Sequence, residues 1–222
     1  MGSDVKAVLS SCPPALAKRS DGGAIDVDWK FISDREGGAL LTGYVPNAAG
    51  SKSGVTVATG VDLGQRSAAD IDKLDITAVL KTKLKPYCGK TSNEAEELLL
   101  KKTPLSITTD EAASLDKAIK QPLLDTLVAA YDAAVDRANT ADQCKRVHFS
   151  ELPQGVQTAL ASINFQYGSL ATPAPNFWKQ VTEQRWADAS KNLANFGDAY
   201  PSRRKLEAGL IDVAITAAGA SK

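Results

Sequence analysis

The strand-like sequence of this chain is confined to one short stretch, residues 39–63. Its first part ends at Pro46-Asn47, a loop rich in Gly and Ser follows, and residues 55–59 alternate β-branched and small side chains. Alternation at a period of two is typical of strands, so we expect one hairpin or three short strands here. No strand pattern recurs beyond this stretch, which excludes βαβ units and a parallel sheet.

Helical patterns occupy most of the remaining chain. A short helix is predicted to end at Glu36, before Gly37-Gly38, because glycine tolerates the left-handed conformation of a helix end. Further along, apolar residues recur every four positions over residues 115–135. Pro122 lies inside this run, and we therefore predict two helices, with the proline in the first turn of the second.

These patterns predict an α+β fold, in which a small β-bearing lobe precedes a mainly helical lobe within one domain, residues 25–222. Residues 1–24 are rich in Ser, Pro and Gly and are expected to form an irregular lead-in or a tail left by cloning. The first residues lack the charged and apolar regions of a signal peptide. We find no segment that approaches the ~20 apolar residues of a membrane span.

Composition excludes several classes of function. The 26 Lys+Arg residues balance 26 Asp+Glu residues, so no strong global charge draws the chain to nucleic acid or anionic lipid. A single histidine, His148, is too few for the usual zinc hydrolase, and neither H-E-x-x-H nor G-x-S-x-G is present. If the protein is a hydrolase, we expect carboxylates to do the chemistry, with no metal and no organic cofactor.

Three cysteines, Cys12, Cys88 and Cys144, leave two redox states open. One disulfide with a free thiol and three reduced thiols are both compatible with their spacing. Cys144-x-x-x-His148 resembles half a zinc site that Cys12 and Cys88 could complete, but such a site is disfavoured because these remaining ligands are isolated in the sequence.

Two carboxylates are candidates for cleavage of a glycosidic bond. Glu36 stands at the end of the first predicted helix, while Asp62 follows Thr56 across a bend at Gly60. The reaction needs one carboxylic acid that protonates the leaving oxygen and a second, charged carboxylate that activates water or stabilises a cationic sugar. On spacing alone, an exposed helix end and a turn aspartate are the more common interpretation of these residues.

Three blocks of this sequence resemble the muramidase domain of pesticin-type toxins, which are relatives of phage lysozymes. The blocks are residues 31–38, 43–46 and 54–64. The last has the specific pattern Gly-Val-Thr-x-x-x-Gly-x-Asp-x-Gly, and the similarity continues through mainly helical segments to span about residues 27–215. The resemblance implies a lysozyme-like fold.

The resemblance also implies roles for the candidate residues. Glu36 is expected to be the general acid, Thr56 to place the attacking water, and Asp62 to supply the second carboxylate. In ordinary phage lysozymes the acidic partner precedes the threonine, whereas here, as in the pesticin type, it follows. The family implies an inverting mechanism, in which the two carboxyl groups lie ~6.5–9.5 Å apart.

Four further residues are expected to bind substrate or support the site. Arg203 stands where phage lysozymes begin their closing helix with Pro-x-Arg, and the resemblance implies that this arginine approaches Glu36. We expect Arg203, or its neighbour Arg204, to tune Glu36. A solvated arginine at a helix start is the alternative. Tyr44, Gln166 and Tyr167 are candidates for the sugar-binding cleft, which favours flat apolar faces and amide donors, although a core position is the alternative for Tyr167.

The resulting hypothesis is a muramidase that cleaves the β-1,4 bond between N-acetylmuramic acid and N-acetylglucosamine in peptidoglycan. A lytic transglycosylase that uses Glu36 alone and a non-catalytic module that binds cell-wall glycan are the alternatives. We expect a monomer that acts in the bacterial periplasm or cell wall after delivery by a secretion system, translocation domain or holin. Its partners would be peptidoglycan glycan strands and, for a toxin rather than a phage endolysin, an immunity protein that blocks the cleft.

Overall fold

The computed structural model describes residues 12–16, 23–50, 52–101, 104–142 and 144–220. The chain forms two compact units. One unit comprises Met1–Val27 and Thr126–Lys222, and the other comprises Asp28–Asp125. We call these the terminal unit and the sheet unit. The predicted single domain over residues 25–222 stays a prediction.

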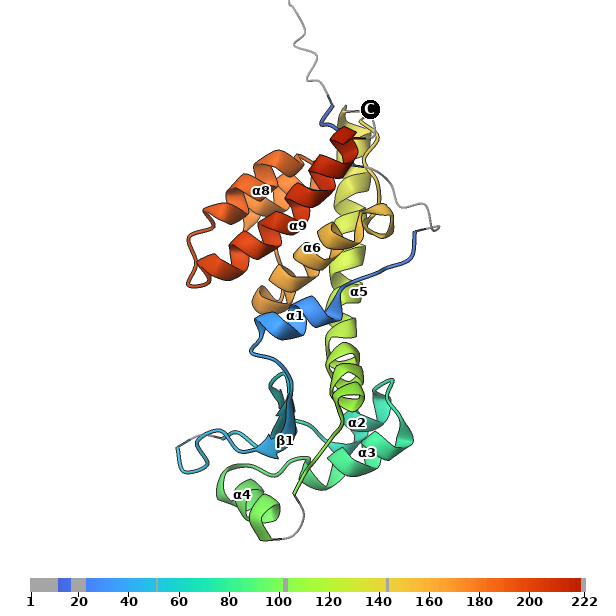
Figure 1. Ribbon diagram of the computed structural model, residues 1–222. Helices are drawn as coiled ribbons and strands as arrows, with labels where there is room; N and C mark the ends of the chain where they lie inside the picture. The colour runs from blue at the N-terminus through green and yellow to red at the C-terminus, as the bar shows by residue number, and fades with distance from the viewer. Residues whose placement is uncertain (1–11, 17–22, 51, 102–103, 143, 221–222) are drawn as a thin grey trace, which may run out of the picture. The chain divides into compact units, whose positions relative to one another are not determined.

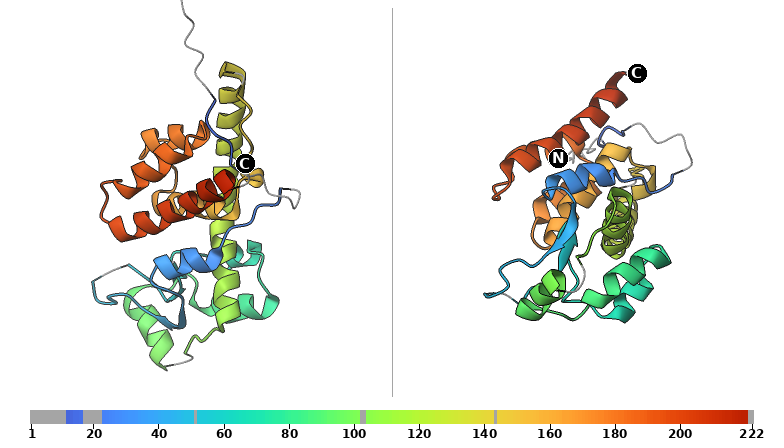
Figure 2. Two further views of the ribbon diagram at one scale, coloured as in Figure 1. Left: turned by 45° about the horizontal axis from the view of Figure 1, so that its top comes forward. Right: turned by 60° about the horizontal axis from the view of Figure 1, so that its bottom comes forward.

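The sheet unit begins with helix α1, Trp29–Arg35. The side chain of Asp28 caps it by accepting a hydrogen bond from the Phe31 N–H at 2.9 Å, which satisfies one of the free amides of the first turn. Glu36 is the C-cap residue, and both following glycines have positive φ values of 92° and 78°. This left-handed segment ends the helix as predicted and leads through a short link into β1, as Figures 1 and 2 show.

Three short strands form one antiparallel sheet in the order β1-β2-β3, which confirms the predicted small sheet. The strands are β1 (Leu40–Tyr44), β2 (Thr56–Ala58) and β3 (Val61–Asp62). In the register, Thr56 stands opposite Tyr44 on one side and opposite Asp62 on the other. The register therefore places Thr56 between Tyr44 and Asp62, which are both predicted site residues.

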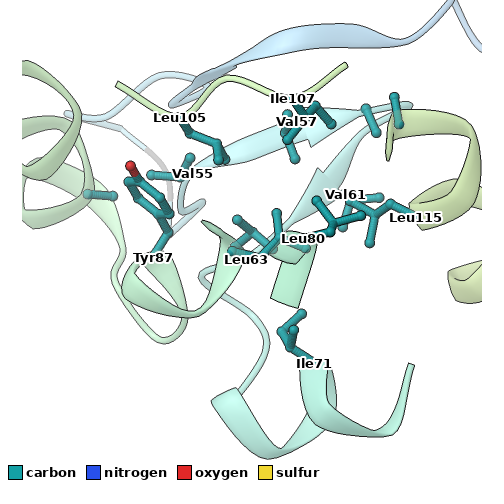
Figure 3. Close-up of a cluster of buried hydrophobic side chains, with 14 residues drawn as sticks. Val55, Val57, Val61, Leu63, Ile71, Leu80, Tyr87, Leu105, Ile107 and Leu115 are labelled. Carbon is teal, nitrogen blue, oxygen red and sulfur yellow. The ribbon is translucent and has the colours of Figure 1, made fainter. Parts of the chain in front are cut away.

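A hydrophobic core holds this sheet against short helices of the same unit. The helices are α2 (Ala68–Lys73), α3 (Ala78–Leu84), η1 (Lys85–Tyr87) and α4 (Ser92–Lys101). Figure 3 shows Val61 of β3 facing Leu115, and Leu63 lying next to Leu80 of α3. Each of these four side chains is at most 5% exposed, and such burial stabilises the fold by roughly 1.5–3 kcal/mol per side chain.

Helix α5 runs without interruption from Thr109 to Asp142, so the prediction of two helices at Pro122 was wrong. Proline in a helix interior removes a backbone hydrogen bond at a cost of about 3 kcal/mol. Buried residues on both sides of Pro122, such as Leu115 and Tyr131, pack into their cores and offset this cost. The four-residue apolar repeat was thus the stronger signal.

The terminal unit is helical. Its helices are η2 (Phe149–Glu151), α6 (Gln154–Tyr167), α7 (Pro175–Thr182), α8 (Trp186–Ala194), α9 (Pro201–Ala220) and the end of α5. Helix α9 packs along α6 and α8, as Figure 1 shows, and α7 packs on α8. Within the described parts of the chain, no helix is both long enough and apolar enough to cross a bilayer.

Cys12 and Cys144 form a disulfide within the terminal unit, with their Cα atoms 5.6 Å apart. Cys88 is a free, half-buried thiol, and burial raises its pKa. Of the two redox states left open by the sequence, the structure shows one disulfide with a free thiol, which also excludes a zinc site that uses Cys144. His148 lies instead 2.8 Å from the Asp136 carboxylate, which raises the pKa of the imidazole.

Breaking the disulfide is expected to lower the free energy of unfolding of the terminal unit by about 2–4 kcal/mol. The cross-link joins residues separated by 132 positions and so restricts the unfolded chain strongly. Thermal unfolding of wild type, Cys12→Ser and Cys144→Ser, with and without reductant, measures the effect. Cys88→Ser is the control, because its reductant response should match wild type. A wild-type melting temperature that does not respond to reduction would contradict the expectation.

Candidate active site

Glu36, Thr56 and Asp62 all belong to the sheet unit. Glu36 is held at the end of α1, while Thr56 and Asp62 are directly opposite each other on β2 and β3. Residues facing each other on neighbouring antiparallel strands have Cβ atoms about 4.5–5.5 Å apart, so the sheet brings these two side chains together. The segment 54–64, with a glycine at each end, therefore places Thr56 and Asp62 beside each other in the sheet.

The Asp62 carboxylate is bound to the backbone on either side of the hairpin. Its Oδ1 atom accepts hydrogen bonds from the N–H groups of Gly54, at 2.9 Å, and Gly64, at 2.8 Å. Both glycines are needed because their backbones touch. A Cβ atom on Gly54 would lie 2.4 Å from both the Gly64 Cα and the Lys90 carbonyl oxygen. The arrangement orients the carboxylate within the sheet.

Thr56 is only 4% exposed, and its hydroxyl donates a hydrogen bond to the Gly54 carbonyl at 3.3 Å. The residue therefore stands beside Asp62 with its hydroxyl engaged by the backbone. Tyr44, on the other side of Thr56, is 39% exposed. The proposed roles of Thr56 in placing water and of Tyr44 in binding sugar stay predictions.

Glu36 forms an ion pair that the sequence did not predict. Its Oε2 atom lies 2.5 Å from Nζ of Lys120, which is on α5 and has a side chain only 12% exposed. Lys120 also donates a hydrogen bond to Oγ1 of Thr59, in the turn between β2 and β3, at 3.2 Å. One ammonium group thus joins the end of α1 to the sheet.

Asp116 lies one helical turn before Lys120 and is 6% exposed. Its Oδ1 atom accepts the Thr59 N–H at 3.1 Å, while Oδ2 is buried without a hydrogen-bond partner among the described residues. Burial raises the pKa of Asp116, and the charge of Glu36 raises it further, although the Thr59 hydrogen bonds and Lys120 act in the opposite direction. A pocket of about 340 Å³ reaches Asp116 and Lys120 between α1, β1 and α5.

Sequence reasoning missed Asp116 and Lys120. Both occur in a helical segment whose apolar repeat indicates packing, and charged residues between apolar positions normally face water. The one sequence signal for Asp116 was its place directly after Leu115 of the apolar repeat. In the structure this position falls on the buried side of α5. That pattern alone does not distinguish a site residue from an exposed one.

Gln166, Tyr167 and Arg203 lie in the terminal unit and belong to a cluster around two buried charges, Arg204 and Glu207. Gln166 accepts a hydrogen bond from Arg204 at 2.5 Å, and the Tyr167 hydroxyl donates to Asp198 at 2.8 Å. These contacts give Gln166 and Tyr167 defined structural partners, and their predicted place in a cleft stays a prediction.

Arg203 donates to Glu207 at 3.0 Å and to the Ser162 carbonyl at 2.9 Å. The alternative of a solvated arginine is therefore wrong, because the guanidinium is anchored on a buried carboxylate. The predicted influence of Arg203 on Glu36 concerns both units and stays a prediction. The cation found on Glu36 within the sheet unit is Lys120.

The small antiparallel sheet and the surrounding helices define a lysozyme-like α+β protein. The pesticin family, described as a bacterial toxin homologue of phage lysozyme, matches residues 26–187, and the chain belongs to this family. The family supports a toxin of the muramidase type with glycoside hydrolase activity. Among curated proteins, a sequence search returned no match.

Gly64→Ala is expected to destabilise the sheet unit by about 1–3 kcal/mol or more, as overpacking does. The added Cβ would lie 2.6 Å from the Gly54 Cα and the Lys90 carbonyl oxygen, and it would displace the N–H that binds Asp62. Urea unfolding measures the loss. Gly209→Ala is the control, because open space surrounds that helical position and alanine is neutral or mildly stabilising there. Equal stability of Gly64→Ala and wild type would contradict the close approach.

Proposed function

We propose that this protein hydrolyses the β-1,4 bond between N-acetylmuramic acid and N-acetylglucosamine in peptidoglycan. Membership of the pesticin family supports the class of reaction. The observation that carries the proposal is the pair Thr56–Asp62 on facing strands, with Asp62 bound by two backbone N–H groups, in the same unit as Glu36 at a helix end.

In the proposed mechanism, the Glu36 carboxylic acid gives its proton to the leaving glycosidic oxygen. The Asp62 carboxylate takes a proton from a water molecule that Thr56 helps to place, and the water oxygen bonds to the anomeric carbon as the glycosidic bond breaks. Attack from the face opposite the leaving group inverts the anomeric centre. The hydrogen bonds from Gly54 and Gly64 support this role, because a carboxylate fixed in the sheet needs little reorganisation to act on the water.

A lytic transglycosylase needs no second group that activates water, because the sugar's own hydroxyl closes the ring. That reaction therefore gives no reason for an Asp62 carboxylate oriented by two glycines whose backbones touch. It therefore favours hydrolysis. A purely glycan-binding module would likewise leave the Glu36–Lys120 pair without a function.

As a toxin-type enzyme, the protein would act on the cell wall from the periplasmic side after delivery. Peptidoglycan glycan strands are its proposed binding partner. A producing cell would be protected by an immunity protein that covers the site. The family description, a bacterial toxin homologue of phage lysozyme, supports a toxin effector rather than a phage endolysin.

Glu36→Gln is expected to lower the rate of lysis of purified peptidoglycan by at least about 100-fold, because general acid catalysis contributes 10²–10⁴-fold. The amide keeps the shape of the side chain but has no acidic proton to give. Turbidity loss of a peptidoglycan suspension measures the rate, and circular dichroism checks the fold. Glu96→Gln, at an exposed position on α4, is the matched control and should lyse like wild type. Wild-type lysis by folded Glu36→Gln would remove Glu36 from the mechanism.

A further inference from the structure

We propose that Lys120 is the positioning residue for Glu36, and that Asp116 is the alternative counter-charge that frees Glu36 to carry its proton. The α5 charge cluster, defined as Glu36, Asp116 and Lys120, would then set the pH range of activity. The inference rests on the proposed function, since it assigns the control of the acid in that reaction.

Lys120 is placed to hold Glu36 in one position. Its ammonium contacts the Glu36 carboxylate at 2.5 Å and the Thr59 hydroxyl at 3.2 Å, and both charged side chains are largely withdrawn from water, at 12% and 21% exposure. Charges interact more strongly when solvent is partly excluded. Because Lys120 is carried by α5 and also contacts Thr59 in the β2–β3 turn, its ammonium fixes the end of the Glu36 side chain relative to the sheet.

Asp116 lies one turn earlier on α5, where burial raises its pKa and the charge of the Lys120 ammonium acts to lower it. Thr59 links the two α5 residues, because its N–H donates to Asp116 and its hydroxyl accepts from Lys120. The charges of Glu36 and Lys120 both act on Asp116, in opposite directions. The cluster therefore contains two carboxyl groups and one ammonium group within mutual electrostatic range.

One ammonium balances only one carboxylate, so the cluster is neutral when it holds a single carboxyl proton. The proton can reside on Asp116 while Glu36 pairs with Lys120, or on Glu36 while ionised Asp116 balances Lys120. The second state is the one that general acid catalysis requires. The buried Oδ2 of Asp116, without a hydrogen-bond partner among the described residues, agrees with a group that changes its protonation state.

Several of the other charged groups on neighbouring elements have contacts of their own. Asp34 pairs with Lys30 on α1, the Arg35 guanidinium lies over the Phe31 ring, and Glu111 on α5 pairs with Lys83. Asp62 on β3 is bound by the two glycine N–H groups, and Lys117 on α5 is exposed. Their electrostatic effect on the α5 charge cluster is therefore the same in wild type and in the variants.

Lys120→Met and Asp116→Asn should move the pH profile of peptidoglycan lysis in opposite directions. Lys120→Met removes the positive charge beside the Glu36 carboxylate, so the alkaline limb of its activity should move to higher pH. Removing the alternative counter-charge leaves Glu36 as the sole carboxylate for Lys120, so the alkaline limb of Asp116→Asn should move to lower pH. Lys120→Arg keeps the charge and should keep the wild-type limb.

Lys117→Met and Asp125→Asn are matched controls at exposed positions of α5 and should keep the wild-type profile. Thermal unfolding checks that each variant folds. If Asp116→Asn does not fold, the comparison of Lys120→Met with Lys120→Arg tests the proposal by itself. Loss of activity at every pH with an unmoved alkaline limb would overturn the proposal and leave Lys120 with a structural role only. Wild-type activity of Glu36→Gln would instead overturn the proposed function, so the two failures are distinguishable.

Discussion

The close approach of Gly54 and Gly64, with the Asp62 carboxylate bound across both of their N–H groups, is the constraint on which the site depends. It closes the β2–β3 hairpin at its open end and sets Asp62 opposite Thr56. Next to these glycines, Val55 and Leu63 are fully buried, so the same segment also contributes to the hydrophobic core of the sheet unit. Packing and carboxylate orientation therefore have one cause, and a side chain at either glycine would disturb both.

The second carboxylate is held by different means. Glu36 is carried by the end of a helix and joined through Lys120 to α5 and to the turn after β2. The ion pair is largely buried, and such a pair gains strength from solvent exclusion while each charge depends on its partner. The site thus combines a carboxylate fixed by neutral backbone donors with one fixed by a charged side chain. Two different environments are what separate the roles of paired carboxyl groups in glycoside hydrolysis.

Local sequence signals were sufficient for the small sheet, the end of α1 at Gly37-Gly38 and the placement of Thr56 and Asp62, because each depends on turn chemistry and a period of two. They failed at Pro122, where core packing outweighs the local cost of proline and α5 continues. They also failed for Asp116 and Lys120, since contacts across 57 and 84 positions of sequence depend on tertiary structure that periodicity does not specify. Cysteine spacing left the disulfide open for the same reason, and only the folded chain pairs Cys12 with Cys144.

Addition of water across the glycosidic bond is the central claim, and the product of the reaction tests it most directly. Digestion of purified peptidoglycan in ¹⁸O-enriched water, followed by mass spectrometry of the released muropeptides, distinguishes the two ways of breaking the bond. Hydrolysis at N-acetylmuramic acid predicts reducing ends that carry one ¹⁸O atom. Products that end in 1,6-anhydro-N-acetylmuramic acid, with no ¹⁸O, would contradict the account and assign the cleavage to Glu36 without Asp62.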